Sequence, residues 1–332
     1  MTKSLNEVCW GIIGAGDVCE VKSGPALQFA DNSKLVAVMR RDEDKAEDFA
    51  LRHMVKKWYN DADELINDND VNAIYIATPP NLHKYYTLKA AQAGKPVYVE
   101  KPMGRSYKEC EEMVQACKNL GIPLFVAYYR RALPNILKVK EIIDSGVLGD
   151  IRFINIRMQK TLEPDILIGV KDLVNWRVDP EVSGGGYFYD LASHQLDVMD
   201  FIFGPIIEAK GFSLNQAGKY PADDITMGIF KFENGIIGHG VWAFNTSKIS
   251  DIEVTIIEGS NGRVSFPFFG DNSVTLDIEG KAKEVFRFTI SKHIQQPLIQ
   301  TIVDELMNNG KCDSTGASAA RTNWVMDEIC GK

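Results

Sequence analysis

Residues 8–19 read Val-Cys-Trp-Gly-Ile-Ile-Gly-Ala-Gly-Asp-Val-Cys, and this stretch predicts the fold of the first part of the chain. The apolar run ending at Ile13 is typical of a buried strand, and a glycine-rich turn leads from it into a first helix. Gly14 permits a tight turn, and Gly16 lets backbone N–H groups approach a pyrophosphate at the helix N-terminus. The alternative is a tight turn without a ligand. We predict a dinucleotide site that includes Gly14, Ala15, Gly16, Asp17 and Val18.

Four more apolar segments follow and alternate with helical patterns. The predicted strands are Val8–Ile13, Lys34–Met39, Val71–Ala77, Pro96–Val99 and Pro123–Ala127. The predicted helices are Asp42–His53, Leu82–Ala93 and Tyr107–Lys118. Apolar strands that alternate with helices indicate a parallel sheet covered on both faces. Residues 1–129 are therefore expected to form a dinucleotide-binding Rossmann domain.

The pattern changes after about residue 130, where strands dominate and residues 130–332 are expected to form an α/β domain. The predicted strands are Ile151–Gln159, Ile206–Ser213, Asp224–Phe232, Ile236–Phe244, Ile252–Glu258, Arg263–Phe266 and Ser273–Ile278. The predicted helices are Pro134–Ser145, Tyr187–Phe203, Gln296–Asn308 and Ala317–Ile329. Asn-Gly pairs at 234–235 and 261–262 indicate hairpins, hence an open, mostly antiparallel sheet. Because the outer face of such a sheet needs a cover, we expect a homo-oligomer, dimer or tetramer, built through it.

Composition excludes several classes of protein. A chain of 332 residues with 45% hydrophobic and 25% charged residues is typical of two globular domains. Lys+Arg 37 minus Asp+Glu 45 gives −8, and no basic run points to nucleic acid or a membrane surface as partner. No apolar stretch reaches the roughly 18 residues of a membrane span. Met1 to Val8 lacks a signal-like segment, and the six cysteines form no C-x-x-C pair, so a reducing cytoplasm is expected.

The residues after the second predicted strand bear on the choice of dinucleotide. NAD sites place Asp or Glu there to accept from the ribose 2′-hydroxyl. This chain has Arg40 and Arg41 instead. A guanidinium suits a 2′-phosphate, so NADP is the predicted cofactor. NAD stays open, because Asp42 or Asp44 could fold back onto a ribose hydroxyl.

Further motifs occur in a recognisable order. They are Thr78 to His83, Glu100-Lys101-Pro102, Tyr128 to Arg131, Trp176-Arg177 and Ser183 to Asp197. With the glycine-rich turn, they resemble the Gfo/Idh/MocA family of sugar and cyclitol oxidoreductases over nearly the whole chain. The stretch from Trp176 to Gly186 is similar to the 1,5-anhydrofructose reductases of that family. Cys19 and Ala192 depart from the family pattern, which has Gly or Ala at the first position and often Gly at the second.

The resemblance implies hydride transfer between a nicotinamide and a hydroxyl or carbonyl carbon of a sugar-like substrate. Such chemistry needs proton exchange with the oxygen and stabilisation of a developing alkoxide. His194, with an ordinary pKa of about 6.5, suits the first task, and the Lys101 ammonium suits the second. The family pattern assigns Asp190 to substrate hydroxyls. It adds to the cofactor-binding residues Thr78, Pro79, Asn81, His83, Glu100 and Lys101.

The predicted roles of several individual residues leave alternatives open. Asp190 and His194, four residues apart on the predicted helix, should share one face. Asp197 falls on the same face, but we expect no metal there, because one helix face cannot easily surround an ion. The candidate substrate residues are Tyr128, Trp176, Arg177, Asp190 and His194. Strand alternation would turn only one of Tyr128 and Tyr129 inward. The alternative reading of the Trp-Arg pair is a core tryptophan beside a surface arginine.

His83 fits a helix-terminal structural role as well as a cofactor contact, and the Lys101–Pro102 bond is a candidate cis peptide. Two other functions compete with sugar oxidoreduction. One is dehydrogenation of an inositol or a non-sugar diol. The other is a non-catalytic, nucleotide-sensing regulator, against which the retained Lys101, Asp190 and His194 argue.

Overall fold

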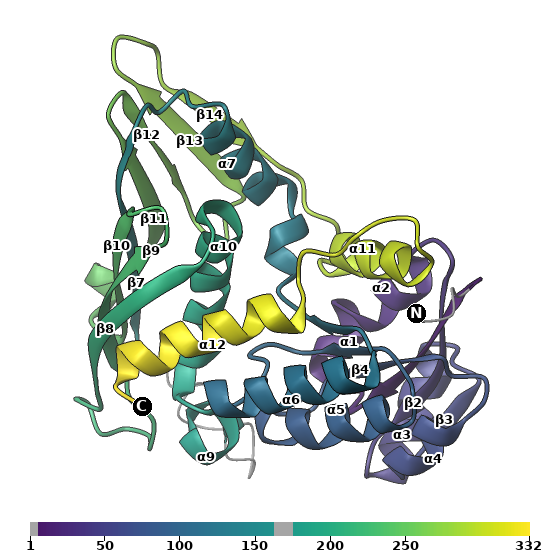
Figure 1. The fold of residues 1–332 in the computed structure, drawn as a ribbon. Helices are drawn as coiled ribbons and strands as arrows, with labels where there is room; N and C mark the ends of the chain where they lie inside the picture. The colour runs from purple at the N-terminus through teal and green to yellow at the C-terminus, as the bar shows by residue number, and fades with distance from the viewer. Residues whose placement is uncertain (1–5, 163–174) are drawn as a thin grey trace. The chain divides into compact units, whose positions relative to one another are not determined.

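The computed structural model describes residues 6–162 and 175–332, which form two compact units. The first unit contains the described residues up to Ala132 together with Ser291–Ala320. The second contains Leu133–Ile290 and Arg321–Lys332. Each unit is built on its own sheet (Figure 1). None of the helices in the described part of the chain is both long and apolar enough to cross a membrane.

The first unit carries a six-stranded sheet in the order β3-β2-β1-β4-β5-β6, and all its strand pairs are parallel. The strands are β1 (Val8–Ile13), β2 (Ser33–Met39), β3 (Lys57–Tyr59), β4 (Ala73–Ile76), β5 (Val97–Val99) and β6 (Leu124–Val126). The predicted parallel sheet is confirmed. The edge strand β3 was not predicted, because it has only three residues and all are half-buried.

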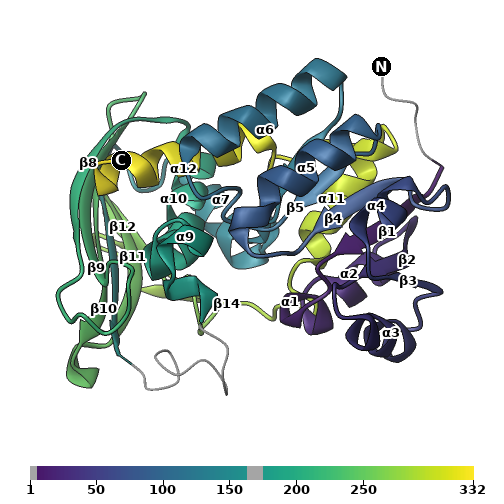
Figure 2. The same ribbon diagram turned by 90° about the horizontal axis from the view of Figure 1, so that it is seen from below.

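Helices cover both faces of this sheet. They are α1 (Asp17–Val21), α2 (Gly24–Phe29), α3 (Glu43–Arg52), α4 (Ala62–Asn67), α5 (His83–Gln92), α6 (Tyr107–Leu120) and α11 (Gln296–Leu306), with 3₁₀ turns η1 (Pro80–Leu82) and η2 (Tyr129–Ala132). Figure 2 shows α1, α2 and α3 on one side of the sheet and α4, α5 and α6 on the other. The strands are consequently buried on both faces, as in other doubly wound sheets.

Local sequence fixes where these helices start and stop. The Asp42 side chain accepts a hydrogen bond from the N–H of Lys45 at the start of α3, and Ser106 accepts one from Glu109 at the start of α6. Such N-caps satisfy backbone N–H groups that have no partner inside the helix. Gly121 ends α6 in the left-handed conformation at φ +67°. The short α2 and α4 were not predicted.

The second unit is built on an eight-stranded sheet in the order β14-β13-β12-β11-β7-β10-β9-β8. Its strands are β7 (Ile151–Thr161), β8 (Ile206–Leu214), β9 (Ile225–Phe232), β10 (Ile237–Thr246), β11 (Ile252–Gly259), β12 (Gly262–Phe266), β13 (Ser273–Ile278) and β14 (Glu284–Arg287). Only β7 and β10 pair in parallel, so the predicted open, mostly antiparallel sheet is confirmed. Both predicted Asn-Gly hairpins are present, between β9 and β10 and between β11 and β12.

The helical segments of the second unit are α7 (Pro134–Asp144), η3 (Trp176–Val178), α9 (Pro180–Ser183), η4 (Phe188–Ala192), α10 (Ser193–Phe203), η5 (Lys248–Ser250) and the end of α12 (Gly316–Cys330). Figure 1 shows α7 and α10 on the same side of the sheet. The segment predicted as one α-helix over Tyr187–Phe203 contains a π-helical turn at Phe188–Ala192. Such turns occur often at functional sites.

A glycine row lets α12 lie close to this sheet. Gly211 on β8 pairs with Gly228 on β9, and Ile329 of α12 packs against both. Strand alternation turns their neighbours to the opposite face, where Phe212, Met227 and Ile229 are exposed. One face of the sheet is thus packed and the other carries exposed apolar side chains.

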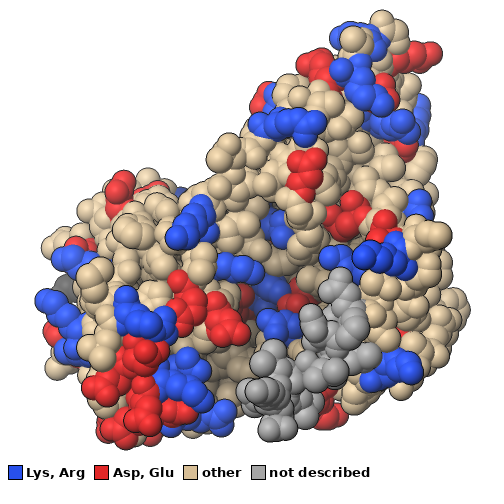
Figure 3. Space-filling view, turned by 180° about the vertical axis from the view of Figure 1, so that it is seen from behind, with Lys and Arg blue, Asp and Glu red and all other residues tan. Residues whose placement is uncertain are grey.

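Charges of both signs are interspersed over the molecular face in Figure 3, outside the residues drawn in grey. Ion pairs such as Arg52–Glu20 at 2.7 Å and Lys89–Asp63 at 2.6 Å join neighbouring elements of the first unit.

Candidate functional site

The glycine-rich turn at the end of β1 is tied to the end of β2. The N–H groups of Gly14 and Ala15 donate to the carbonyl oxygen of Met39 at 2.9 and 3.2 Å. Gly14 has φ +85°, and a Cβ there would lie 2.7 Å from Thr78 Cγ2. Gly16 has φ −107°, and a Cβ there would meet only the Gly14 oxygen, at 3.8 Å. The fold therefore requires a glycine at 14, whereas at 16 it leaves open space.

Helix α1 begins directly after this turn. Its first residues, Asp17 and Val18, present backbone N–H groups that cannot bond within the helix. Cys19 is completely buried, and burial raises the pKa of its thiol to about 12. The thiol stays neutral and fills the third small position of the motif as an apolar group. Cys19 therefore maintains the close helix–strand packing that a glycine normally allows there.

The basic pair after β2 adjoins the glycine turn, because Met39, the acceptor for that turn, is the residue before Arg40. The Arg40 N–H donates to the Tyr59 oxygen at 3.2 Å, which fixes the backbone at this point. Among the described residues neither Arg40 nor Arg41 forms an ion pair. Asp42 is occupied: its side chain caps α3 and pairs with Lys45 at 2.8 Å.

The segment after β4 supplies unsatisfied polar groups. Within the described residues, Thr78 Oγ1 and Asn81 Oδ1 are buried without a hydrogen-bond partner. Such atoms fit a polar ligand that would satisfy them. His83 does not behave in the same way, because its Nε2 lies 2.7 Å from the backbone carbonyl oxygen of Thr78 and its Nδ1 lies 3.0 Å from the backbone carbonyl oxygen of Pro102. Burial lowers its pKa, and the ring braces two loops, which favours the structural reading.

The Glu100-Lys101-Pro102 motif follows β5 and is anchored by residues distant in sequence. The buried Glu100 carboxylate accepts from Tyr75 Oη at 2.6 Å and from Gln295 Nε2 at 2.7 Å. Tyr98 Oη donates to Gln295 Oε1 at 2.8 Å and completes the network. The Lys101–Pro102 bond is cis, as predicted. The Lys101 backbone is thus held beside a fixed carboxylate at the carboxyl edge of the sheet.

Tyr75, Tyr98 and Gln295 were missed in the sequence. Both tyrosines lie inside strands, where the sequence pattern predicts that an aromatic residue belongs to the hydrophobic core. Gln295 comes from the Ser291–Ala320 segment, which the sequence does not connect with β5. The expected alternation of Tyr128 and Tyr129 was wrong: both are buried, because they follow the end of β6 and Tyr129 begins a 3₁₀ turn.

In the second unit, the π-helical turn brings Asp190 to the Trp-Arg motif. Arg177 Nε lies 3.4 Å from Asp190 Oδ2, and the Arg177 guanidinium lies 4.4 Å from the centre of the Trp176 ring. Asn175 Nδ2 donates to Tyr187 Oη at 2.9 Å, which ties this segment to the turn. Trp176 is half-exposed rather than part of the core. An aromatic face, a guanidinium and a carboxylate therefore lie together, a combination suited to a polyhydroxylated ring.

His194 lies in the first turn of α10 and is buried. The Phe269 ring meets it edge-on, with ring centres 6.2 Å apart and planes at 69°. Asp197, one turn further on, is buried and lies 3.5 Å from Thr322 Oγ1. In residues 6–162 and 175–332, no three His, Cys, Asp or Glu side chains are placed to hold a metal ion.

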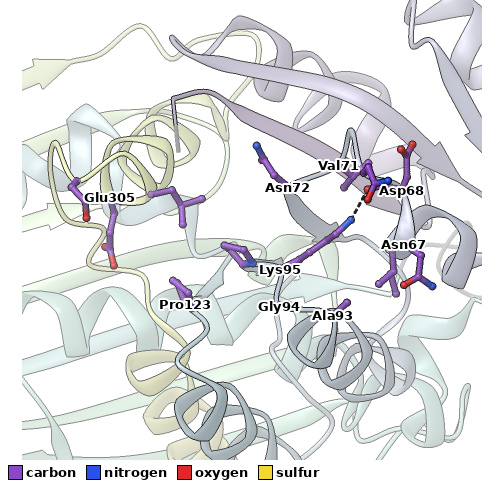
Figure 4. Close-up of a pocket in the computed structure, with 14 residues that line it drawn as sticks. Asn67, Asp68, Val71, Asn72, Ala93, Gly94, Lys95, Pro123 and Glu305 are labelled. Atoms are coloured by element: carbon purple, nitrogen blue, oxygen red, sulfur yellow. Dashed lines mark hydrogen bonds between the residues drawn. The ribbon is translucent and has the colours of Figure 1, made fainter. Parts of the chain in front are cut away.

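A separate cavity of about 590 Å³ opens at the other edge of the Rossmann sheet. It is lined by residues that precede β4, β5 and β6, including Asn72, Lys95 and Pro123 (Figure 4). Lys95 Nζ donates to the backbone carbonyl oxygen of Asp68 at 2.8 Å, and burial lowers the pKa of this amine. In a parallel sheet this is the amino edge, opposite the glycine turn. The cavity is therefore not part of the dinucleotide site.

Comparisons with known proteins agree with this arrangement. Residues 8–128 match the family model "Oxidoreductase family, NAD-binding Rossmann fold", and residues 136–265 match the GFO/IDH/MocA C-terminal domain. The chain is 40% identical to Oxidoreductase P35 of Formosa agariphila over 98% of its own length and 99% of that protein. It is 29% identical to the 1,5-anhydro-D-fructose reductase of Ensifer adhaerens, covering 76% of this chain and 74% of that one.

Among solved structures, levoglucosan dehydrogenase in complex with NADH and levoglucosan superposes with a TM-score of 0.85. It is 19% identical and the match covers 97% of this chain and 96% of that one, so this likeness concerns the fold. The open space at Gly16 and the unsatisfied Thr78 and Asn81 oxygens fit the NAD-binding domain that the family model describes. The chain belongs to the GFO/IDH/MocA family of oxidoreductases and carries the NAD-binding Rossmann domain of that family.

Proposed function

We propose that the protein is an NADP-preferring oxidoreductase that acts on a hydroxyl or carbonyl carbon of a sugar-like substrate. The observation that carries the substrate class is the junction of Asp190, Arg177 and Trp176 in the second unit. Sugars present hydroxyl groups at their rims and C–H groups on their ring faces. The carboxylate and the guanidinium suit the hydroxyls, and the indole suits a ring face.

The preference for NADP rests on the residues after β2. Asp42 caps α3 and pairs with Lys45, so this carboxylate is engaged away from a ribose hydroxyl. Arg40 and Arg41 form no ion pair within the described residues and are available to a 2′-phosphate. Phosphate recognition by guanidinium groups involves strong, charge-assisted hydrogen bonds. A 2′-hydroxyl would gain little from them.

The cofactor preference is tested by measuring dissociation constants for NADPH and NADH. We expect wild-type protein to bind NADPH more tightly, and the double variant R40A/R41A to lose about tenfold or more in NADPH affinity. NADH serves as the internal control, because it lacks the 2′-phosphate, and its affinity should change little. Tighter NADH binding by the wild type would disprove the proposed preference.

The proposed chemistry assigns one role to the cofactor and one to each of the motif residues Lys101, His194 and Asp190. NADP supplies or accepts the hydride when bound. The Lys101 ammonium stabilises the negative charge that develops on the substrate oxygen. His194 exchanges the proton with that oxygen, and its buried position limits competition from bulk water. Asp190 holds a substrate hydroxyl while Arg177 fixes the Asp190 carboxylate.

Turnover on a panel of alcohols tests this assignment. The panel contains pyranoses such as D-glucose, myo-inositol, the acyclic polyols D-sorbitol and glycerol, and a non-sugar cyclic diol, each followed at the nicotinamide absorbance band. His194→Ala should lower kcat about 10²–10⁴-fold with the preferred pyranose. His293→Ala is the control, because the His293 ring bonds the Val21 backbone oxygen and stacks on Phe29, and its loss should leave kcat unchanged. A preference for the diol or the inositol would reject the sugar assignment.

We further propose that a second copy of the chain covers the outer face of the eight-stranded sheet. Phe212, Met227 and Val241 form one cross-strand row on β8, β9 and β10, and Phe212 is 81% exposed. Apolar rows of this kind mark association surfaces, and a self-complementary face favours a dimer or a dimer of dimers. Light scattering of the wild type should give a molar mass that is a multiple of 37.1 kDa. Ile229→Lys should lower the measured mass toward that of a monomer. A monomeric wild type would contradict this.

A further inference from the structure

A carboxylate in the sheet of the second unit fixes a loop next to His194. Glu253 Oε2, on β11, accepts the backbone N–H groups of Phe268 and Phe269 at 2.8 and 3.0 Å. These two residues belong to the loop between β12 and β13. A carboxylate that receives two adjacent N–H groups fixes the backbone more firmly than a single neutral hydrogen bond does. The loop is consequently held to the sheet at this point.

The other oxygen of the same carboxylate reaches α10. Gln195 Nε2 donates to Glu253 Oε1 at 3.0 Å, and Trp242 Nε1 donates to Gln195 Oε1 at 2.6 Å. Gln195 and Trp242 are fully buried. Gln195 is the residue after His194, so this chain of bonds also limits how the first turn of α10 can rotate. One carboxylate thus joins the backbone of the loop to the helix that carries the proposed acid–base group.

The two phenylalanines of the loop differ in what they touch. Phe268 is buried against Phe266, with ring centres 5.3 Å apart, and anchors the loop. Phe269 is only partly buried, and its ring stands at 69° to the His194 imidazole. A purely structural ring would gain more by joining the core. Phe269 instead presents apolar surface beside His194.

We propose that Phe269 forms a wall of the substrate pocket that contacts the C–H face of a sugar-like ring, and that Glu253 is the positioning residue for this wall. This inference rests on the proposed function, since it takes His194 as the acid–base group. Ring sugars and acyclic polyols both carry hydroxyl groups, but only the ring has a continuous C–H face to pack on an aromatic side chain. Phe269 therefore contributes to selectivity for ring substrates over open-chain polyols.

The test compares the preferred pyranose with D-sorbitol and glycerol. Phe269→Ala should raise KM for the pyranose about five- to tenfold, the scale of a lost aromatic contact, while kcat changes less than about twofold. KM for the acyclic polyols, or their inhibition constant where they are not turned over, should stay within about twofold. Phe269→Leu keeps apolar bulk and should recover part of the loss. Equal effects on ring and open-chain ligands, or none on either, would overturn the proposal.

The role of Glu253 is tested by a double-mutant cycle with Phe269. If Glu253 acts through Phe269, Glu253→Ala raises KM for the pyranose, and the double variant is no worse in KM than the poorer single variant. Additive losses in KM would show that Glu253 does not position this wall. Thermal unfolding of each variant identifies those that fail to fold, and Glu253→Gln, which keeps one acceptor, is the fallback variant.

Phe29→Ala is the control, because Phe29 likewise contacts a histidine ring, that of His293, with ring centres 5.3 Å apart. It should leave both KM values unchanged. A wild-type protein that turns over no pyranose would refute the proposed function, and this proposal with it. A wild type that turns over pyranoses but whose Phe269→Ala variant keeps its KM would refute only the wall.

Discussion

Gly14 and Gly16 provide a sharp test of the dinucleotide site, because the structure assigns them different physical tasks. At Gly14 an alanine would adopt φ +85° and place its Cβ 2.7 Å from Thr78 Cγ2 and 3.0 Å from the Thr78 nitrogen. The left-handed conformation costs an L-residue roughly 1–2 kcal/mol, and overpacking costs about 1–3 kcal/mol more. Gly14→Ala should thus lose about 2–5 kcal/mol of stability, and Tm should fall by roughly 4–20 °C.

At Gly16 the same substitution should leave the apo protein almost unchanged. The φ of −107° is open to any residue, and the new methyl would find only the Gly14 oxygen, at 3.8 Å. If that open space admits a pyrophosphate, the methyl occupies ligand space instead. An overpacking cost of about 1–3 kcal/mol would weaken NADPH binding roughly 5- to 150-fold.

Thermal unfolding of apo protein and NADPH titration of each variant separate these two effects. Gly94→Ala is the control for conformation alone, since Gly94 has φ +75° but no atom within 4 Å of a new Cβ. It should lose about 1–2 kcal/mol of stability and keep its NADPH affinity. The reasoning is refuted if Gly16→Ala binds NADPH as the wild type does, or if it unfolds as early as Gly14→Ala.

Two further predictions concern stability. The Arg52 guanidinium holds the pKa of Glu20 at about 2, below its ordinary value of 4.5. The ionised carboxylate therefore stabilises the folded protein fully above pH 5. This contribution to the free energy of unfolding is lost as the pH falls toward 2. Both side chains of this ion pair are partly exposed, so Glu20→Gln should cost only about 0.5–1 kcal/mol of stability at pH 7. Urea titrations should show a smaller stability difference between wild type and variant at pH 3.5 than at pH 7. Gly211→Ala should destabilise more than Gly228→Ala, because its methyl would meet backbone oxygens, whereas at Gly228 the three nearest atoms belong to the Ile329 side chain, at 2.9 Å. Equal losses in urea would contradict the assigned packing.

Local sequence was a good guide wherever one element decides its own structure. The apolar strands and the Asn-Gly hairpins depend on neighbouring residues, and the structure confirms both sheets. Short elements escaped prediction, because three or six residues give too little periodicity to recognise. The π-helical turn at Phe188–Ala192 also escaped, since it differs from an α-helix only in hydrogen-bond pattern.

Hydrogen bonds between side chains that are distant in the sequence could not be predicted, for a different reason. Glu100 was recognised as part of a motif, but the Gln295 amide that holds it comes from a segment nearly two hundred residues away. His83 carried no signal that both its ring nitrogens would face backbone carbonyls. Periodicity predicts which face of an element is buried, but not which distant polar group meets it.

At several candidate functional groups, a residue outside the motif fixes the orientation of a motif residue. This pattern predicts which substitutions will affect activity. Glu100 is fixed by Gln295, and the loop beside His194 is fixed by Glu253. Tyr189, next to Asp190, donates to Asp327 of α12 at 2.6 Å. The reactive or binding groups come from recognisable motifs, whereas the groups that orient them lie outside those motifs. Because buried hydrogen bonds to carboxylates are costly to break, replacing an orienting residue should disturb the chemistry even though every motif residue is intact.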